Sequence, residues 1–522
     1  MANDTIPVAK LQEILARARR VADAHEFEAL LEMLDEFMPS SEEITDNEAA
    51  AQVRSQMLVL RGKAHQILGH WARAEDDVRG VLGLATRLQD RSSLVAALLI
   101  LGQLQKDRGE PQDALDTFIN ASKVAEAIED RYGLAEADLS VASLGSKMGD
   151  PKEGESRMRR ALQAVEGMEA LPRAARILAS ALVQRAVEAM RKGQHDDLVS
   201  LCNRALKVMA DDPLSLEAAE AYRFLGVHAS MRLQQREALD NHVRALDIYK
   251  KVGFKFGQAK IYNSIGQTML AMSRSDEAIH FMEKAEVICN EIGAHSEAAT
   301  LWGKLGQVYL QREEFDKAFS YFSKDLQMSK KQGGKRALAY IHRNLGLTLG
   351  QRGEVSDAIA HFKESAQLFQ QLGDELNTGR LYLDLCQLYV RQKNFERARA
   401  MAQWAQSILS KLKQTFDIAY INTLMGMIHR GEKKYPESEK YFKDAVEFFN
   451  FREPGERLVE TLHEYGRLLH EMGKKDRAME RLLAALQHAR GLGLKQQAQR
   501  AFNMLERLDE VYLIRTFMEG QV

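Results

Sequence analysis

The sequence predicts an all-α protein built as a solenoid of helical hairpins. Three observations predict this fold: a forty-residue period along most of the chain, a helical spacing of apolar residues within each period, and only eight prolines in 522 residues. Because proline interrupts helices, such a low proline content permits long helices almost everywhere. A fixed period of this length is typical of stacked supersecondary units, each of which buries its apolar face against its neighbours.

A small residue marks each repeat. Steps of forty residues from Gly306, with one step of forty-four, reach eleven positions that hold glycine, alanine or cysteine. These markers are Gly62, Gly102, Ala142, Ala186, Gly226, Gly266, Gly306, Gly346, Cys386, Gly426 and Gly466. A second small residue follows twelve positions later in ten of the eleven repeats, and a mostly bulky apolar residue follows four positions after that, as in Ala318 and Phe322. Small residues let two helix backbones approach closely, while large ones fill the space beside them.

Each repeat is predicted to consist of two helices and a short turn, as with REEF at residues 312–315. Pro111, Pro151 and Pro436 fall where the second helix should begin, a position at which the missing N–H costs nothing. Glycines that suit helix C-terminal caps recur at one phase after the second helix. They are Gly253, Gly293, Gly333, Gly373 and Gly493, with Gln89-Asp90 and Glu129-Asp130 at this phase in earlier repeats.

The pattern Trp302-x2-Leu305-Gly306-x2-Tyr309, followed by Ala318 and Phe322, resembles the tetratricopeptide repeat. The forty-residue unit is similar to the lengthened class found in LGN/Pins-type polarity adaptors, kinesin light chains and MalT-like bacterial regulators. The resemblance covers roughly residues 50–490 as eleven repeats. It implies a right-handed superhelical solenoid of about 11–12 helical hairpins with a C-terminal capping helix.

Three regions are expected along the chain. Residues 1–49 form an acidic, degenerate helical hairpin, in which HEFEALLEMLDEF echoes REEFDKAFSYF. Residues 50–493 form the solenoid of eleven repeats, and residues 494–522 form the capping helix. Residues 150–215 depart from the pattern at Leu198 and carry Pro172 and Pro213 nearby. Two interpretations stay open there, a kink between two solenoid halves and an unbroken superhelix.

Charge and cysteine content exclude several classes of protein. The formal net charge of −2 argues against a general nucleic-acid binder, which usually carries a strong basic excess. Cys202, Cys289 and Cys386 lie far apart, which is neither a disulfide framework nor metal-ligand spacing, and they fall at packing phases where inert buried thiols are expected. The N-terminus has no secretory signal pattern, and the longest apolar run, residues 94–101, is too short to cross a bilayer. We therefore expect a cytoplasmic protein without membrane insertion.

No motif for catalysis, a cofactor or a metal is found. KQGGKR at residues 331–336 lacks the leading glycine and the hydroxyl residue of a phosphate-binding loop. His463-Glu464 and His470-Glu471 lack the second histidine of a zinc-protease helix. Asp325 stands at a phase that is otherwise mostly alanine, where we expect it to pair with a nearby lysine or arginine, a groove-facing carboxylate being the alternative. We predict a protein that is not an enzyme and has no cofactor.

Function is expected on the concave inner wall, which the first helix of each repeat lines in tetratricopeptide repeat proteins. The phases left free by packing are six and three residues before the marker, and one and four after it. In repeats six to eleven they predict a peptide-binding groove made of Lys260, Asn263, Gln267, Gln307, Tyr340, Arg343, Arg380, Gln387, Tyr420, Arg430, His463 and Arg467. Earlier repeats carry Lys63, Gln66, Gln103, Lys106, Glu220 and Arg223 at the same phases.

These residue types suit an extended peptide. A glutamine amide both donates and accepts, so a row of glutamines could bond the peptide main chain, although glutamine is equally a good solvated helix former. Arginine forks and tyrosines suit a carboxylate-bearing segment.

The favoured function is a non-enzymatic adaptor or scaffold that binds a linear, acidic segment of another protein. The alternative is a signal-responsive regulator that binds a short peptide or small effector and changes conformation or sequesters a partner. A third interpretation is self-association, because residues 1–50 carry four basic and twelve acidic residues while residues 251–522 have a net charge of +6. The acidic N-terminus could then dock into the groove of the same or a second copy.

Overall fold

The computed structural model describes residues 8–38, 47–148, 151–168, 170–332, 334–451 and 455–509. Within these residues the chain forms twenty-five α-helices and no strands. The chain divides into two compact units, Met1–Leu301 and Trp302–Val522. The prediction of an all-α repeat fold is confirmed.

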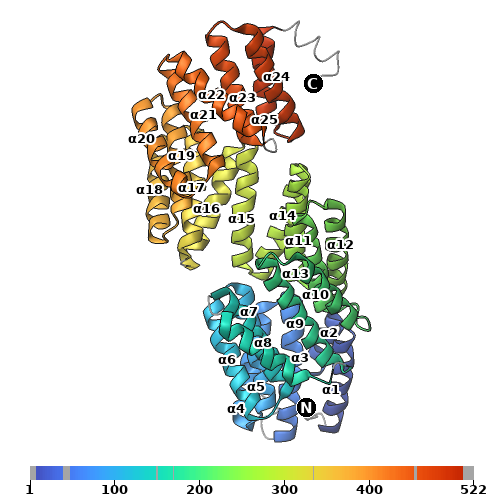
Figure 1. Ribbon diagram of the computed structural model, residues 1–522. Helices are drawn as coiled ribbons and strands as arrows, with labels where there is room; N and C mark the ends of the chain where they lie inside the picture. The colour runs from blue at the N-terminus through green and yellow to red at the C-terminus, as the bar shows by residue number, and fades with distance from the viewer. Residues whose placement is uncertain are drawn as a thin grey trace. The chain divides into compact units, whose positions relative to one another are not determined.

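The first unit contains fourteen complete helices and the beginning of a fifteenth (Figure 1). The helices are α1 (Val8–Asp23), α2 (Phe27–Phe37), α3 (Glu48–Ile67), α4 (Trp71–Leu88), α5 (Arg91–Arg108), α6 (Pro111–Ala127), α7 (Arg131–Met148), α8 (Pro151–Val165), α9 (Pro172–Arg191), α10 (His195–Val208), α11 (Leu216–Met231), α12 (Gln235–Val252), α13 (Lys255–Ala271) and α14 (Ser275–Ile292).

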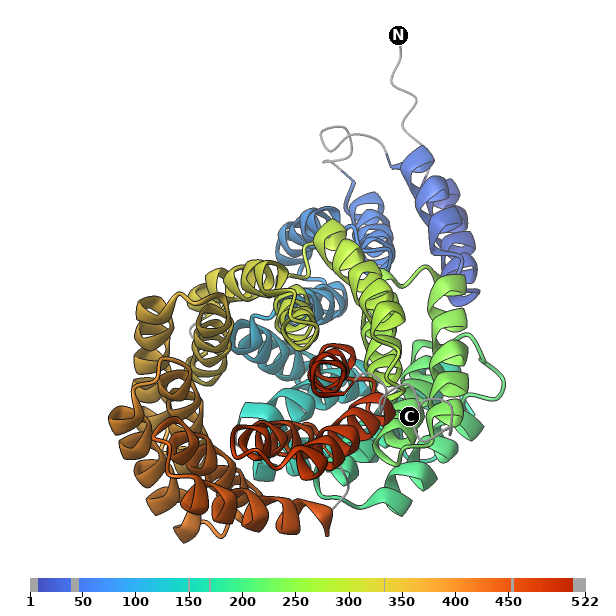
Figure 2. The ribbon, with the colours of Figure 1, turned by 90° about the horizontal axis from the view of Figure 1, so that it is seen from above.

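The second unit begins within α15 (His295–Gln311). It continues with α16 (Phe315–Gln332), α17 (Lys335–Arg352), α18 (Val355–Gln371), α19 (Glu375–Arg391), α20 (Phe395–Lys411), α21 (Thr415–Gly431), α22 (Tyr435–Asn450), α23 (Glu456–Glu471), α24 (Lys475–Gly491) and α25 (Lys495–Leu508). Figure 2 shows the hairpins of this unit following one another along a curved row.

Each predicted repeat corresponds to one helical hairpin, from α3–α4 to α23–α24. The marker residue lies on the first helix and faces the bulky residue sixteen positions later on the second. A Cβ placed on Gly102 would lie 2.7 Å from the Phe118 ring, and one placed on Gly346 would lie 2.7 Å from the Phe362 ring. The same contact recurs in the hairpins whose marker is glycine, and glycine is needed there because the side chain sixteen residues later fills the space that a Cβ would take.

The expected helix ends are also present. Pro111 and Pro151 are the first residues of α6 and α8, and Pro436 is the second residue of α22. The capping glycines at residues 253, 293, 373 and 493 all have positive φ, as does Gln89 with φ 52°. Gly333 lies outside the described residues.

The two ends of the chain pack on their neighbouring hairpins. Helices α1 and α2 pack on each other and on α3, and α25 packs on α24. The division into residues 1–49, 50–493 and 494–522 stays a prediction. Parts of the acidic N-terminal segment (residues 1–7 and 39–46) and of the expected capping region (residues 510–522) lie outside the described residues. Docking of the N-terminus into a groove and a kink within residues 150–215 stay predictions.

Asp325 differs from its expected role. Its side chain is buried in α16, accepts a hydrogen bond of 3.1 Å from Ser329, and faces Gly303 on α15. In the described part of the chain no lysine or arginine lies within ion-pairing distance of Asp325, so the expected pairing with a basic residue is wrong. Burial raises the pKa of Asp325 to about 6, and the hydrogen bond from Ser329 only partly offsets this rise.

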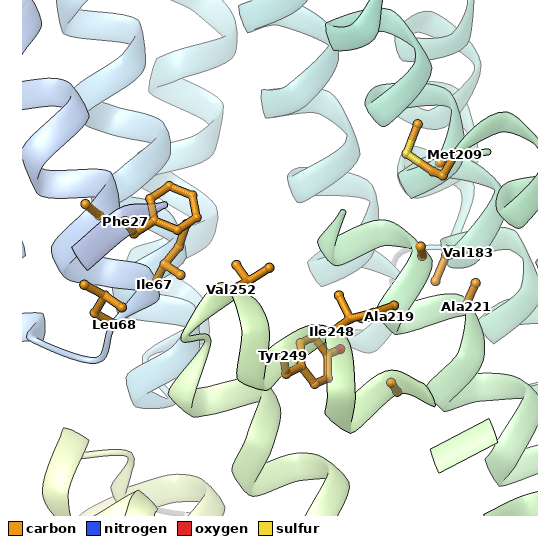
Figure 3. Packing of buried hydrophobic residues seen from close by; sticks show 14 of the residues in the cluster. Phe27, Ile67, Leu68, Val183, Met209, Ala219, Ala221, Ile248, Tyr249 and Val252 are labelled. Carbon is orange, nitrogen blue, oxygen red and sulfur yellow. The ribbon is translucent and has the colours of Figure 1, made fainter. Parts of the chain in front are cut away.

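The hairpin row of the first unit closes on itself. Repeats of a solenoid normally contact only their neighbours. Here the turn after α3 reaches the later hairpins, because a Cβ on Gly69 would lie 2.5 Å from Ile292 and one on Gly253 would lie 2.6 Å from Leu68. Phe27, Ile67 and Leu68 belong to the same buried cluster as Ile248, Tyr249 and Val252 (Figure 3). We call this contact between α2–α4 and α12–α14 the seam.

Candidate functional site

A cavity of about 420 Å³ lies inside the closed row of the first unit. Its walls come from the first helices of six consecutive hairpins: α3, α5, α7, α9, α11 and α13. Small-molecule and peptide sites usually have volumes of about 300–1,000 Å³. The cavity therefore has the size of a ligand-binding site.

Charged and apolar side chains share the cavity wall. The basic residues are Lys63, Lys106, Arg191, Arg223 and Lys260, and the acidic residues are Asp107, Glu188, Glu217 and Glu220. Apolar wall comes from Val183, Val187, Leu216, Phe224, Phe254 and Phe256, among others. Among ligand sites, an apolar wall with a few placed polar groups is the usual arrangement.

One ion pair in the cavity is satisfied from within the protein. Arg223 donates to Glu220 at 2.7 Å, and the Tyr249 hydroxyl donates to the same carboxylate at 2.6 Å. Burial alone would raise the pKa of Glu220, but the charges of Arg223 and Lys260 together with these hydrogen bonds lower it to about 2. Glu220 is therefore ionised and fully engaged, and it stabilises Arg223 on the same helix face.

Lys106 and Asp107 are adjacent in α5 and both line the cavity. Asp107 accepts a hydrogen bond of 2.7 Å from the Gln103 side-chain amide, whereas Lys106 donates to the side-chain oxygen of Gln103 only at 3.5 Å. Burial raises the pKa of Asp107 and lowers the pKa of Lys106. Neither charge is fully compensated, so the cavity destabilises both ionised forms.

Phe256 connects the cavity with the seam. The Lys260 ammonium lies 4.0 Å from the centre of the Phe256 ring, inside the cavity. The Phe256 ring also packs edge-on against Trp71, at 5.6 Å between ring centres. A ligand that displaces Lys260 or Phe256 would therefore act directly on the seam contact.

Several cavity groups have unused hydrogen-bonding capacity. Within the described residues, Lys63, Lys106 and Lys260 have no carboxylate within ion-pairing distance. The buried carbonyl oxygen of Gln184 has no hydrogen-bond donor there. The buried side-chain oxygen of Gln184 is costly to leave without a partner, and a bound ligand could complete it. Lys63 is exposed, and Lys106 and Lys260 are half-buried.

Of the twelve predicted groove residues, Lys260 lines this cavity, and the other two from the first unit lie farther along α13. Asn263 is buried and donates to Glu297 at 3.1 Å. Gln267 is exposed and donates to Asn263 at 3.1 Å. The polar side chains of this helix are thus partly occupied by one another.

The predicted arginines of the second unit are engaged in ion pairs. Three of these pairs join the first helices of successive hairpins. Arg343 contacts Asp384 at 2.5 Å, Arg380 contacts Asp417 at 2.9 Å, Arg430 contacts Glu464 at 2.6 Å, and Arg467 contacts Glu464 at 3.0 Å. Arg343, Arg380 and Arg430 therefore join neighbouring hairpins, whereas Arg467 pairs within α23. An acidic peptide would have to compete with the carboxylates that these arginines contact.

The remaining predicted residues differ in whether their side chains already have hydrogen-bond partners. Tyr340 accepts a hydrogen bond of 2.7 Å from Asn377, and His463 lies 3.4 Å from Glu464. Tyr420 and Gln387 both donate to Glu460, at 2.9 Å and 3.0 Å. Gln307 is exposed and has no partner within the described residues. The structure thus brings Tyr420 and Gln387 together on one carboxylate and leaves Gln307 available.

Several of the residues that line the cavity could be predicted from the sequence. Lys63, Gln66, Gln103, Lys106, Glu220, Arg223 and Lys260 occupy the predicted inner-wall phases and line the cavity. The prediction emphasised repeats six to eleven because arginines and tyrosines are more frequent there. The sequence prediction did not include the ion pairs of those arginines or the contact between distant hairpins of the first unit. These two features direct attention to the cavity instead of repeats six to eleven.

A second cavity, of about 480 Å³, lies between α24 and α25. Its lining includes Leu486, Leu494 and Phe502.

The fold and its inner cavity define an α-helical repeat protein with a ligand-sized internal surface. Residues 257–331, 335–411 and 417–491 match the model of the tetratricopeptide repeat. Tetratricopeptide repeats are therefore present in residues 257–491 of this chain, and this fold supports protein-interaction scaffolds.

Solved structures with a similar arrangement of helices have low sequence identity. The apo form of RapI has a TM-score of 0.47 and 17% identity, covering 53% of this chain and 99% of that one. The apo form of the quorum sensor NprR from B. thuringiensis has a TM-score of 0.44 and 14% identity, covering 74% and 99%. The Cut9–Hcn1 complex has a TM-score of 0.44 and 13% identity, covering 93% and 95%. A comparison with curated protein sequences finds no match.

No described helix is both long and apolar enough to cross a membrane. No group of three or more histidine, cysteine, aspartate or glutamate side chains in the described part is placed to hold a metal ion.

Proposed function

We propose that this chain is a non-enzymatic protein-interaction module that binds a short segment of a peptide or partner protein in the cavity of the first unit. The observation that carries this proposal is the cavity itself. It combines ligand-like volume, an apolar wall, and the buried side-chain oxygen of Gln184, which has no hydrogen-bond donor among the described residues. A cavity of this size suits a few peptide residues and excludes a whole helix.

The test is a substitution that fills the cavity. Ser180 on α9 lines the cavity, whereas Arg185 on the same helix is exposed and does not. The full chain is dialysed against a pool of randomised tripeptides, and the retained peptides are measured by mass spectrometry. We expect the wild type and Arg185→Trp to retain a subset of the pool and Ser180→Trp to lose it with its melting temperature kept. If the wild type retains nothing, or Ser180→Trp retains the same peptides, the cavity is not a peptide site.

A second candidate function is a ligand-responsive regulator, and the position of Phe256 favours it. Phe256 lines the cavity and contacts Trp71 across the seam, so ligand binding and seam closure share one side chain. A ligand that prefers the closed seam would stabilise it by its differential affinity for the two states. Amide hydrogen exchange in the α3–α4 turn, with and without the retained peptides, tests this function. If amide hydrogen exchange in this turn is unchanged when the cavity is saturated with peptide, the protein binds the peptide without a regulatory response at the seam.

The twelve groove residues predicted from the sequence stay a proposal for contacts with a larger partner. Replacing Gln267, Gln307, Arg343 and Gln387 by alanine tests them. We expect weaker partner pull-down with the fold intact, and unchanged pull-down would remove these residues from the binding surface.

A further inference from the structure

Two histidine side chains face each other across the hairpin α17–α18 of the second unit. His342 lies on α17 and His361 lies on α18, and their Nδ1 atoms are 2.9 Å apart. Both residues are half-buried, so the pair lies at the edge of the hairpin, within reach of solvent. One imidazole donates this hydrogen bond through Nδ1–H and the other accepts it. The hairpin therefore holds two nitrogen ligands side by side.

The separation of these nitrogens suits a metal ion. Zinc binds imidazole nitrogen at about 2.0–2.1 Å, so two such nitrogens around a tetrahedral ion lie about 3.3 Å apart. The observed 2.9 Å is close to this value, and a small rotation of each ring would aim both lone pairs at one point. The ring that donates in the hydrogen-bonded pair would then carry its proton on Nε2, so the two imidazoles release no proton on binding.

Two carboxylates flank the pair on α18. Asp357 lies four residues before His361 and Glu364 lies three residues after it, which places all three side chains on one helix face. Burial is the largest cause that lowers the pKa of both histidines, while the negative charge of Glu364 acts on both in the opposite direction. Glu364 is therefore near both rings. It is exposed and has no hydrogen bond or ion pair within the described residues, so its side chain can rotate toward the rings.

We propose that His342 and His361 bind a divalent cation of the zinc class, with Glu364 as the third ligand and water completing the coordination. Two histidines and one glutamate are an established ligand set for zinc. The side chains as placed already bring the two imidazoles together, and the glutamate joins them on binding. Such an ion would connect α17 to α18 and stabilise this hairpin by mass action. The inference does not depend on peptide binding in the first unit.

A second histidine pair of similar geometry has a different electrostatic environment. The Nδ1 atoms of His65 and His70, at the turn between α3 and α4, are 3.2 Å apart. Burial, His70 and the positive charges of Arg61 and Arg73 lower the pKa of His65 to about 4. The carboxylate of Asp77, 3.9 Å from the His65 ring, is held by Arg61 at 2.6 Å. A further positive charge is unfavourable there, so we expect no cation at this pair.

The experiment measures zinc binding by the full chain without a histidine tag. The protein is dialysed against micromolar zinc chloride, and the bound metal is counted by elemental mass spectrometry. We expect one equivalent of zinc. His342→Ala and His361→Ala should each weaken the affinity at least about tenfold, since losing even an outer-shell partner of a metal costs about 10–100-fold. Glu364→Gln should weaken it several-fold.

The exposed Lys330, in the last turn of α16, provides a test in the opposite direction. Its positive charge lowers the pKa of both histidines, after the larger effect of burial, and it should likewise repel a cation. Lys330→Gln should therefore increase the affinity for zinc. His70→Ala is the matched control, because it removes one ring of the other pair and should keep the bound zinc.

Thermal unfolding gives a second measurement. Zinc should raise the melting temperature of the wild type and of His70→Ala, but not that of His342→Ala. If an alanine variant melts early without zinc, asparagine at the same position repeats the test, because an amide can keep the hydrogen bond to the other imidazole. Retention of no zinc by the wild type, or equal retention by the wild type and both alanine variants, would overturn the site. Unchanged affinity in Glu364→Gln would overturn the role of this glutamate as the third ligand.

Discussion

Gly306 lies directly against the ring of Phe322, so that a Cβ on Gly306 would be 2.6 Å from the ring carbon Cε1. The Phe322 side chain is completely buried. The two residues are sixteen positions apart on the two helices of one hairpin, the spacing that recurs throughout the chain. This recurring contact fixes how the two helices of each such hairpin pack. It thereby determines which side chains of the first helix face the inner surface.

Gly306→Ala tests that contact. The added methyl group must displace the Phe322 ring, so we expect the free energy of unfolding of the second unit to fall by about 1–3 kcal/mol. Urea denaturation followed by circular dichroism measures it. The double variant Gly306→Ala/Phe322→Leu should recover part of the loss. Gly491→Ala, which meets no atom within 4 Å, should change stability little, and equal effects of the two alanines would contradict the packing explanation.

Arg430 and Glu464 form a nearly buried ion pair at 2.6 Å. Arg430→Met should lower the free energy of unfolding of the second unit by about 3 kcal/mol, because it leaves a buried carboxylate with weaker partners. The double variant Arg430→Met/Glu464→Gln should lose less than the single variant. A double-mutant cycle from chemical denaturation measures the coupling, and additive losses would mean that the pair does not stabilise stacking.

The stability of the second unit should depend on Asp325 and pH. Burial raises the folded-state pKa of Asp325 from 3.8 to about 6, so the folded protein binds the proton more tightly than the unfolded chain. Ionisation therefore makes Asp325 lower the stability as pH rises through this window, and the loss is complete above it. Asp325→Asn should be more stable than the wild type by on the order of 1–2 kcal/mol at pH 7 and equal to it near pH 4. Denaturation at both pH values measures this, and a constant difference would contradict the assignment.

The three cysteines should be inert in the folded protein. Cys202, Cys289 and Cys386 are buried, and burial raises the pKa of each thiol to about 12. Because the thiolate is the reactive form, we expect labelling by a disulfide reagent at pH 8 only after unfolding. Timed labelling with mass spectrometry follows Cys202 and Cys289 in the first unit separately from Cys386 in the second. Fast labelling of any thiol in the native protein would show that its region opens.

The seam can be tested with two glycines in similar turns. Gly69 has a φ of 83° and faces Ile292, whereas Gly193 has a φ of 72° and meets no atom within 4 Å. Alanine at either site carries the same backbone strain, but only Gly69→Ala pushes on the seam. We expect Gly69→Ala alone to increase hydrogen exchange in the α3–α4 and α12–α13 turns. Equal exchange in both variants would mean that the seam contributes nothing to closure.

The pairing of the arginines was partly accessible from the sequence. Arg343 and Asp384 are 41 residues apart, and Arg380 and Asp417 are 37 apart, close to one repeat. Opposite charges about one period apart, both on first helices, indicate an ion pair between stacked hairpins, although the two aspartates do not stand at the predicted inner-wall phases. The prediction from the sequence considered each repeat separately. It therefore could not distinguish an arginine that pairs with the next hairpin from an arginine that is available to a ligand.

The sequence by itself determined the helical hairpins, their number, their small-to-large contacts and the phases that face inward. These features are local, because each contact joins residues within one repeat or the next, and the period records it. Only the tertiary structure decided that the first unit closes at Gly69 and Gly253, and that Lys106 and Lys260 meet in one cavity. The small rotations between successive hairpins accumulate over several repeats, so contacts between distant hairpins depend on a sum that no single repeat encodes.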